Sequence, residues 1–397
     1  MRFTGVKSVG IRGPIIREGD DLKAIVVDSL LDAIKSENLI LNDKDVIAIT
    51  ESVVARSEGN YATTDQIAKD IYDKYGNEAV GLIHPITSRN RFAIPLKGIA
   101  RGLKKIVLML SYPSDEVGNA LLSIDDLDDK NINPYIDVLS LDEYRKLFGY
   151  KKHEFTGVDY IEYFKNLIEN EDCECEIIFA NQIKTILNYT KNVLTCDIHT
   201  RNRSKRILKE SGAKIVYGLD DILTHSIDGS GFNEKYGLLG SNKATEEKIK
   251  LFPSSKCEKL VCDIQKELLE KTGKKIEVMI YGDGAFKDPQ GKIWELADPV
   301  VSPAFTTGLK GTPNELKLKF LADNQYKDLS GDVLKDAIIE SIKKKDNDLK
   351  GNMVSEGTTP RQITDLLGSL ADLTSGSGDK GTPFILIQGY FDNYTNE

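Results

Sequence analysis

The sequence is poor in the residues that carry metal and thiol chemistry. It contains five cysteines and four histidines in 397 residues. No two cysteines form a CxxC pair, and no two histidines lie at i, i+4 or in an H-E-x-x-H arrangement. The common zinc-binding signatures are therefore excluded. An odd cysteine count without metal spacing predicts reduced thiols that mostly fill the core.

Long apolar runs are also absent. No run approaches the roughly 20 residues that a membrane-spanning helix needs, and the first five residues lack the apolar segment of a signal peptide. We therefore expect a cytoplasmic protein with no membrane partner. The formal net charge of −9 argues against a nucleic-acid partner, because a polyanion is bound by a basic surface. The length and the 40% content of hydrophobic residues predict two or three folded domains.

Two common catalytic loops are missing from the sequence. It has no G-x-x-x-x-G-K-[ST] phosphate-binding loop and no G-x-S-x-G nucleophile elbow. Gly376-x-Gly378-x-x-Gly381 matches a dinucleotide fingerprint in its letters. That fingerprint requires a strand before the glycines and a helix after them, whereas the order expected here is helix, glycines, strand. On spacing alone a helix-to-strand connector is favoured over an anion-binding turn.

Strand and helix patterns alternate along the chain. Apolar segments predict strands at 5–9, 45–50, 105–110, 176–179, 193–195, 214–217, 276–281 and 384–388. Helical spacing predicts helices at 20–36, 65–75, 202–211, 257–271, 332–345 and 360–373. The Asp- and Asn-rich segment 123–133 is expected to be a surface loop. Because strands that are apolar on both faces alternate with helices, we expect a layered α/β fold with α+β elements.

The order of the segments suggests three parts. Residues 1–134 form an N-terminal core, and residues 231–397 form a C-terminal core. Between them, residues 135–230 have the pattern of a separate β-α-β-α unit, which we interpret as an inserted subdomain. Asp228–Gly231 is a polar, Gly-rich linker at its end.

Two acidic residues follow predicted buried strands. Asp115 comes after the strand at 105–110, and Asp283 comes after the strand at 276–281. Ligands of open α/β sheets bind at the carboxyl ends of strands, where two carboxylates could hold a magnesium ion on nucleotide phosphates. Asp is equally common as a cap of a turn, and the pattern favours neither interpretation.

Cationic turns offer candidate anion sites. Gly10-Ile11-Arg12-Gly13 follows the first strand, exposes N–H groups and carries a cation, so it could bind phosphate or simply turn the chain. Thr50, Ser52 and Arg56 follow the next strand. Arg89, Arg91 and Lys97 form a basic cluster, and such clusters are more often solvated surface than anion sites.

One histidine stands in a context that suggests chemistry. His199 follows Asp197 at the end of a predicted strand, although a structural hydrogen-bonded His is the more frequent outcome in such a place.

Two blocks of the sequence resemble the coenzyme F-420-0:L-glutamate ligase (gamma-glutamyl ligase) family. The first is Gly13-Pro14-Ile15-Ile16-Arg17-Glu18-Gly19-Asp20-Asp21-Leu22, followed by the strand at 45–50 and Val53-Val54-Ala55-Arg56-Ser57-Glu58-Gly59. The second is the helix ending near Leu373, then Gly381-Thr382-Pro383 and the apolar strand up to Gly389. The resemblance covers roughly residues 1–130 and 235–390, and the inserted unit is not part of the family pattern.

The resemblance implies a two-part ligase core and a GTP-dependent amide ligase. It would activate a carboxylate acceptor as an acyl-phosphate and join it to L-glutamate or a similar amino acid, with Mg²⁺ or Mn²⁺ on the phosphates. A homodimer is also implied. Asp115, Asp283 and Arg56 would be catalytic, and Asp115 and Asp283 would hold the metal. The nucleotide would contact Gly10, Ile11, Arg12, Gly13, Thr50, Ser52, Arg56, Asn119, Gly376, Ser377 and Gly378.

This sequence departs from the family pattern at three places. Arg56 stands where the family usually has Lys, the spacing from Asp115 to Asn119 is altered, and the Thr expected after Asp283 is Gly284. The acceptor pocket is remodelled, with 236–243 and the inserted unit expected at its border.

Two alternatives stay open at this point. One is a non-catalytic nucleotide- or metabolite-binding protein of the same fold. The other is a phosphotransferase using the inserted unit, which requires Asp197 and His199 to face the same cleft as Asp283.

Overall fold

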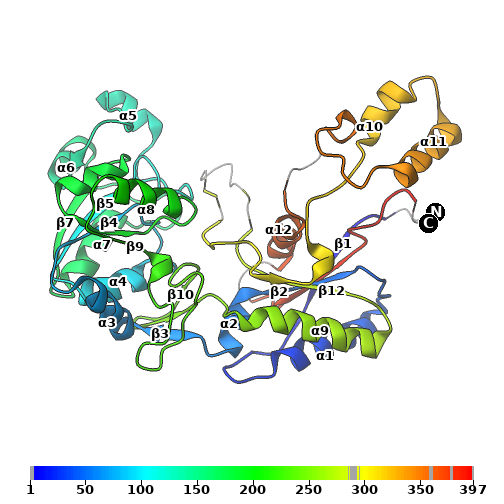
Figure 1. Ribbon diagram of the computed structural model, residues 1–397, viewed down its shortest axis with the longest axis horizontal. Coiled ribbons are helices and arrows are strands. Elements are labelled where there is room, and N and C mark those ends of the chain that lie inside the picture. The colour runs from blue at the N-terminus through cyan, green and yellow to red at the C-terminus, as the bar shows by residue number, and fades with distance from the viewer. Residues whose placement is uncertain are drawn as a thin grey trace.

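The computed structural model describes residues 4–284, 286, 293–294, 296–356, 361–375 and 379–395. They form two lobes, which lie side by side in Figure 1. The first lobe, at the right, is built on a five-stranded sheet, and the second lobe, at the left, on a six-stranded sheet. The predicted mixed α/β fold is confirmed.

The sheet of the first lobe has both faces covered by helices. Its strands lie in the order β1 (Lys7–Ile11), β14 (Phe384–Gln388), β2 (Val46–Thr50), β12 (Glu277–Tyr281) and β13 (Ala304–Phe305). Alternate residues such as Ile47 and Ile49 pack with α1 (Leu22–Glu37) and α9 (Lys256–Thr272). Their neighbours Val46 and Ala48 pack with α12 (Ile363–Ser375). This explains why these strands are apolar without interruption.

The sheet of the second lobe is parallel except for one edge. Its order is β6 (Leu139–Ser140), β7 (Glu174–Phe179), β5 (Lys105–Leu110), β4 (Val80–Ile83), β8 (Asn192–Thr195) and β9 (Ile215–Gly218), with β6 antiparallel. One face is covered by α3 (Thr64–Tyr75), α4 (Ala93–Arg101), α6 (Leu141–Phe148) and α7 (Tyr160–Glu169). The other is covered by α8 (Arg201–Glu210) and the 3-10 turn Ile183–Asn188.

The boundary expected between residues 134 and 135 falls within this sheet. The strands assigned to the inserted unit pair directly with β4 and β5, which precede that boundary. The inserted unit is therefore continuous with part of the expected N-terminal core. A β-α-β pattern in the sequence predicts parallel strands. It does not predict which strand from a distant part of the chain pairs with them. The strand β4 was not predicted because Gly81 interrupts its short apolar run. Glycine is needed at this position because an added Cβ would lie 2.4 Å from Ile186.

Two connections between the lobes are formed by described secondary-structure elements. It leaves the first lobe through α2 (Glu51–Ser57) and β3 (Tyr61–Thr63) and returns through β10 (Asn242–Thr245) and β11 (Lys248–Lys250). The strands β10, β11 and β3 form a small antiparallel sheet. Beyond the outer part of the first lobe lies an extension with α10 (Leu318–Phe320), the π-turn Leu321–Gln325 and α11 (Gly331–Lys344) (Figure 1).

The prediction of a surface loop at 123–133 is wrong. The segment expected to be a loop at 123–133 contains helix α5 (Ile124–Lys130). Ser123 and Asp126 form a capping box, in which each side chain accepts the backbone N–H of the other residue. The capping pattern outweighs the poor helix propensity of the Asp-rich run.

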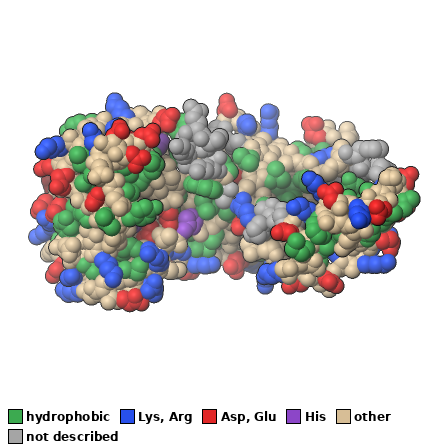
Figure 2. Space-filling model, turned by 90° about the horizontal axis from the view of Figure 1, so that it is seen from above, with side chains coloured by type: hydrophobic (Ala, Val, Ile, Leu, Met, Phe, Trp, Pro, Cys, Tyr) green, Lys and Arg blue, Asp and Glu red, His purple; other side chains and the backbone are tan. Residues whose placement is uncertain are grey.

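The cysteines are reduced, as the sequence predicts. All five cysteines are free, and Cys173, Cys196 and Cys257 are buried. Acidic and basic side chains are interspersed on the face drawn in Figure 2. In the part of the chain that the structure describes, no helix has both the length and the apolar character of a membrane span.

Candidate functional site

Three of the predicted segments meet at one edge of the first lobe's sheet. Strand β14 runs antiparallel to both β1 and β2, and β12 runs parallel to β2. The strands β1, β2 and β12 thus end at the same edge, with Ile11 opposite Phe384 and Thr50 opposite Tyr281. The glycine turn lies at the end of β1, helix α2 with Ser52 and Arg56 follows Thr50 at the end of β2, and Asp283 follows β12. This is the edge at which open α/β sheets bind ligands.

The glycine turn packs tightly against the residues before β14. The N–H of Gly13 donates to the carbonyl of Gly381 at 3.1 Å. An added Cβ on Gly13 would lie 2.8 Å from the Phe384 ring, and one on Gly10 would lie 3.0 Å from Thr382. Gly10 and Ile11, expected in this turn, instead end strand β1, where Ile11 pairs with Phe384 and its side chain is buried. The glycines are therefore needed for close packing, and the N–H of Gly13 is already used.

Cationic side chains remain available at the same edge. Arg12, Ser52 and Arg56 are exposed, and Thr50 precedes α2 with its N–H bonded to the carbonyl of Pro383. Exposed guanidinium groups beside a strand-end turn are suited to phosphate oxygens. The predicted nucleotide contacts Gly376, Ser377 and Gly378 lie outside the described residues.

Asp283 is held in an ion-pair network that joins the two lobes. Arg91, from the loop between β4 and α4, donates from Nη2 to Asp283 Oδ2 and from Nη1 to Asp298 Oδ1, both at 2.6 Å. The carboxylate of Asp298 also accepts the N–H of Asp283 at 2.8 Å. Burial alone lowers the pKa of Arg91, but the carboxylates of Asp298, Asp283 and Glu51 raise it above its ordinary value. The guanidinium is therefore charged at any physiological pH.

A second buried pair lies beside this network. Lys250 donates to both carboxylate oxygens of Glu51, at 2.8 and 3.0 Å. Asn242 approaches the same carboxylate at 3.4 Å. Lys250 comes from β11 and Glu51 from the start of α2, so the pair fixes the crossing segments to the end of β2.

Asp298 should make stability depend on pH. Burial raises its pKa to about 8 from the usual 3.8, with Arg91 opposing the shift and Asp283 and Glu51 adding to it. Between these values the folded protein retains a proton that the unfolded chain has lost, so stability falls as the pH rises through this window. One such group contributes a slope of at most about 1.4 kcal/mol per pH unit.

Urea unfolding of the wild type and Asp298→Asn between pH 5 and 8 tests this expectation. The variant should have the flatter dependence of unfolding free energy on pH. Equal slopes in the two proteins would show that Asp298 does not titrate in this range.

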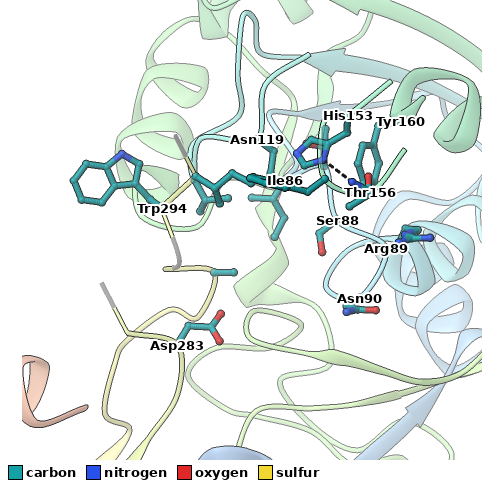
Figure 3. A pocket seen from close by; sticks show the side chains of 15 residues that line it. Ile86, Ser88, Arg89, Asn90, Asn119, His153, Thr156, Tyr160, Asp283 and Trp294 are labelled. Carbon is teal, nitrogen blue, oxygen red and sulfur yellow. Dashed lines mark hydrogen bonds between the residues drawn. The ribbon is translucent and has the colours of Figure 1, made fainter. Parts of the chain in front are cut away.

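A cavity of about 460 Å³ lies between the lobes (Figure 3). Asp283 borders it from the first lobe, across from Asn119 and His153 of the second lobe. The loops after β4 and β5, the segment 153–160 and the segment after β12 supply the rest of the lining, which includes Ser88, Arg89, Asn90, Phe155, Tyr160 and Trp294. The lining thus contains residues of the expected inserted unit. The segment 236–243 lies just behind it, where the carbonyl of Gly240 accepts from Arg91 at 3.2 Å.

Comparison with known proteins bears on what this cavity does. A family model described as F420-0:Gamma-glutamyl ligase matches residues 10–389, nearly the whole chain. The chain belongs to the F420-0:gamma-glutamyl ligase family. No curated protein matches it. The family match supports a ligase that acts on small molecules.

Asp115 does not have the environment that a metal ligand of this ligase family would need. Its carboxylate accepts five hydrogen bonds, from the N–H and hydroxyl of Thr87, the N–H groups of Val117 and Asn119, and the amide of Asn119. Burial raises the pKa of Asp115, and the bonds from Thr87 and Asn119 oppose the shift. These donors occupy the oxygen lone pairs. Asp115 organises the loop that carries Asn119 to the cavity.

The metal that the ligase family implies does not fit the residues in their present arrangement. Asp115 is saturated, and Asp283 is paired with Arg91. Within the described ranges, no three His, Cys, Asp or Glu residues are grouped so that they could hold a metal ion. The metal pair predicted from sequence is thus replaced here by a hydrogen-bonded turn and an ion pair.

Asp197 and His199 do not join this cavity. Asp197 is buried and accepts from Thr200 and Ser204. His199 is hydrogen-bonded through Nε2 to the carbonyl of Leu296, and neither residue is among the described lining of the cavity. The arrangement required by the phosphotransferase alternative is therefore not found.

Sequence reasoning missed Asp298, Glu51 and Lys250 and undervalued Arg91. Arg91 was noticed only as part of a basic cluster. Its partners lie 192 and 207 residues away along the chain, beyond the reach of local patterns. The one available signal was the Asp298-Pro299 pair, which follows β12 and Asp283 in the sequence.

Proposed function

We propose that the protein is a GTP-dependent amide ligase of the cytoplasm, which activates a carboxylate acceptor as an acyl-phosphate and joins it to L-glutamate or a similar amino acid. The proposal includes the homodimer implied by the resemblance. GTP would arrive with the Mg²⁺ or Mn²⁺ that its phosphates carry, and no step is assigned to a metal held by the protein. The observation that supports the proposal is the cavity lined by segments that follow strands of two α/β lobes, in a chain of this family.

The chemistry needs separate places for phosphates and for the joined molecules. Transfer of the terminal phosphoryl group to the acceptor carboxylate forms a mixed anhydride and releases GDP. The amine of glutamate then attacks the acyl carbon, loses a proton and displaces phosphate. Arg12 and Arg56 are exposed at the edge of the first lobe, where they would offset phosphate charge.

The polar groups of the cavity suit the acceptor and the amino acid. Arg89 offers a cation for a carboxylate, and Ser88, Asn90 and Asn119 offer neutral hydrogen-bonding groups. Burial lowers the pKa of His153, so its imidazole is neutral near pH 7. A cavity of this size accommodates small molecules rather than a folded partner.

Turnover in the presence of a metabolite extract tests the proposal. We expect release of GDP and phosphate that depends on L-glutamate, together with a product heavier than its acceptor by one glutamate residue. Asp283→Asn should lower this rate about a hundredfold, because displacement of the cavity wall misaligns the reactants. Lys69→Ala, which removes an exposed ion pair with Asp228, should not change it.

Binding of GTP without any stimulation of hydrolysis by amino acids or extracts would instead support the non-catalytic binding protein. Equal behaviour of Asp283→Asn and the wild type in that assay would strengthen this outcome.

A further inference from the structure

The guanidinium of Arg91 fills the space between two carboxylates of the other lobe. Its Nη2 contacts Asp283, and its Nη1 contacts both Asp298 and the carbonyl of Gly240. The Arg91 side chain is 14% exposed and that of Asp298 is 0% exposed. A planar, permanently charged group with several donors is suited to this position. The two carboxylates therefore form a cation-binding site, and the guanidinium of Arg91 occupies it.

The backbone holds the two carboxylates together. The N–H of Asp283 donates to Asp298 Oδ2, and an added Cβ on Gly282 would lie only 2.1 Å from the same oxygen. The chain therefore passes so close to Asp298 that only glycine fits at position 282. When both are ionised, two carboxylates fixed in this way repel each other unless a cation lies between them.

We propose that Arg91 is the resident cation at Asp283, in the position that the family resemblance gives to a divalent metal. Free Mg²⁺ or Mn²⁺ then does not bind Asp283 while Arg91 is paired with it. The positive charge at this wall of the cavity comes from the chain and does not vary with metal concentration. The second predicted ligand cannot compensate, because Asp115 is occupied by five hydrogen bonds.

The inference takes the metal position from the family resemblance and does not rest on GTP binding or ligase turnover. Its test uses Mn²⁺ alone, without GTP. The Mn²⁺ result can therefore contradict this inference while ligase activity is found, and ligase activity can be absent while the inference is supported.

Mn²⁺ titration followed by electron paramagnetic resonance separates a filled site from an open one. The wild-type chain should bind no more Mn²⁺ than Asp283→Asn. Arg91→Ala should gain one Mn²⁺ site that the wild type lacks. The double variant Arg91→Ala/Asp283→Asn should lose the gained site.

A matched control removes a different arginine from carboxylates. Arg101 pairs with Asp65, Glu171 and Glu247, so Arg101→Ala also uncovers acidic groups, but away from Asp283. It should gain no comparable site.

Mn²⁺ bound to the wild type and lost in Asp283→Asn would overturn the proposal. This comparison does not depend on whether Arg91→Ala folds. A gain in Arg91→Ala that persists in the double variant would also overturn it, because the new site would not involve Asp283.

Discussion

Replacing Lys250 by Met is expected to lower the free energy of unfolding by about 3–5 kcal/mol. Glu51 is only 5% exposed and Lys250 only 8% exposed, and the Lys250 ammonium contacts both oxygens of the Glu51 carboxylate. Methionine fills the space of the aliphatic stem but leaves the carboxylate buried without its cation. Urea denaturation at neutral pH measures the loss.

Two companion variants separate charge from packing. Glu51→Gln/Lys250→Met removes both charges, so it should be more stable than Lys250→Met alone. Lys69→Met breaks the exposed pair with Asp228 and should cost less than about 1 kcal/mol. If Lys250→Met and Lys69→Met unfolded alike, the buried pair would have no special role in stability.

Asp115→Ala should also destabilise the chain, by about 3 kcal/mol or more, because it leaves several buried donors without an acceptor. The donors are the five N–H and O–H groups supplied by Thr87, Val117 and Asn119. The expected loss is independent of metal, so EDTA should not change it in thermal or urea unfolding. The cavity should lose the fixed position of Asn119 at the same time.

The control for this variant is Asp126→Ala. Asp126 also accepts the N–H and hydroxyl of a nearby residue, Ser123, but at an exposed helix start, and its loss should cost about 1 kcal/mol. If EDTA changed the loss caused by Asp115→Ala, Asp115 would be a metal ligand after all. In that case Mn²⁺ would raise the stability of the wild type and not that of Asp115→Ala.

Local patterns were sufficient for many elements of this fold. The strands β5 and β14 begin and end where their apolar runs do, and α1 begins after Asp21, whose side chain accepts the N–H of Ala24. Such elements are set by hydrophobic periodicity and by caps within a few residues of each other. The edge that gathers Gly10–Gly13, Thr50 and Asp283 also follows from strands that end in the same direction.

What failed were relations between distant parts of the chain. The pairing of β4 and β5 with β7 and β8 depends on packing across the sheet, so the expected boundary divided one sheet. The pairs of Arg91 with Asp283 and of Lys250 with Glu51 join residues nearly 200 positions apart. Asp115 was weighed evenly between metal ligand and turn cap, and its surroundings decide for the turn.

The segment after β12 ties the two lobes together beside the cavity. The backbone N–H of Trp294 donates to the carbonyl of Val117 at 2.6 Å, and the carbonyl of Leu296 is hydrogen-bonded to His199 Nε2 at 2.9 Å. The stretch that begins with Asp283 in one lobe is thus fastened to the other. The ion pair between Arg91 and Asp283 crosses the same gap, so separating the lobes at this point would break it.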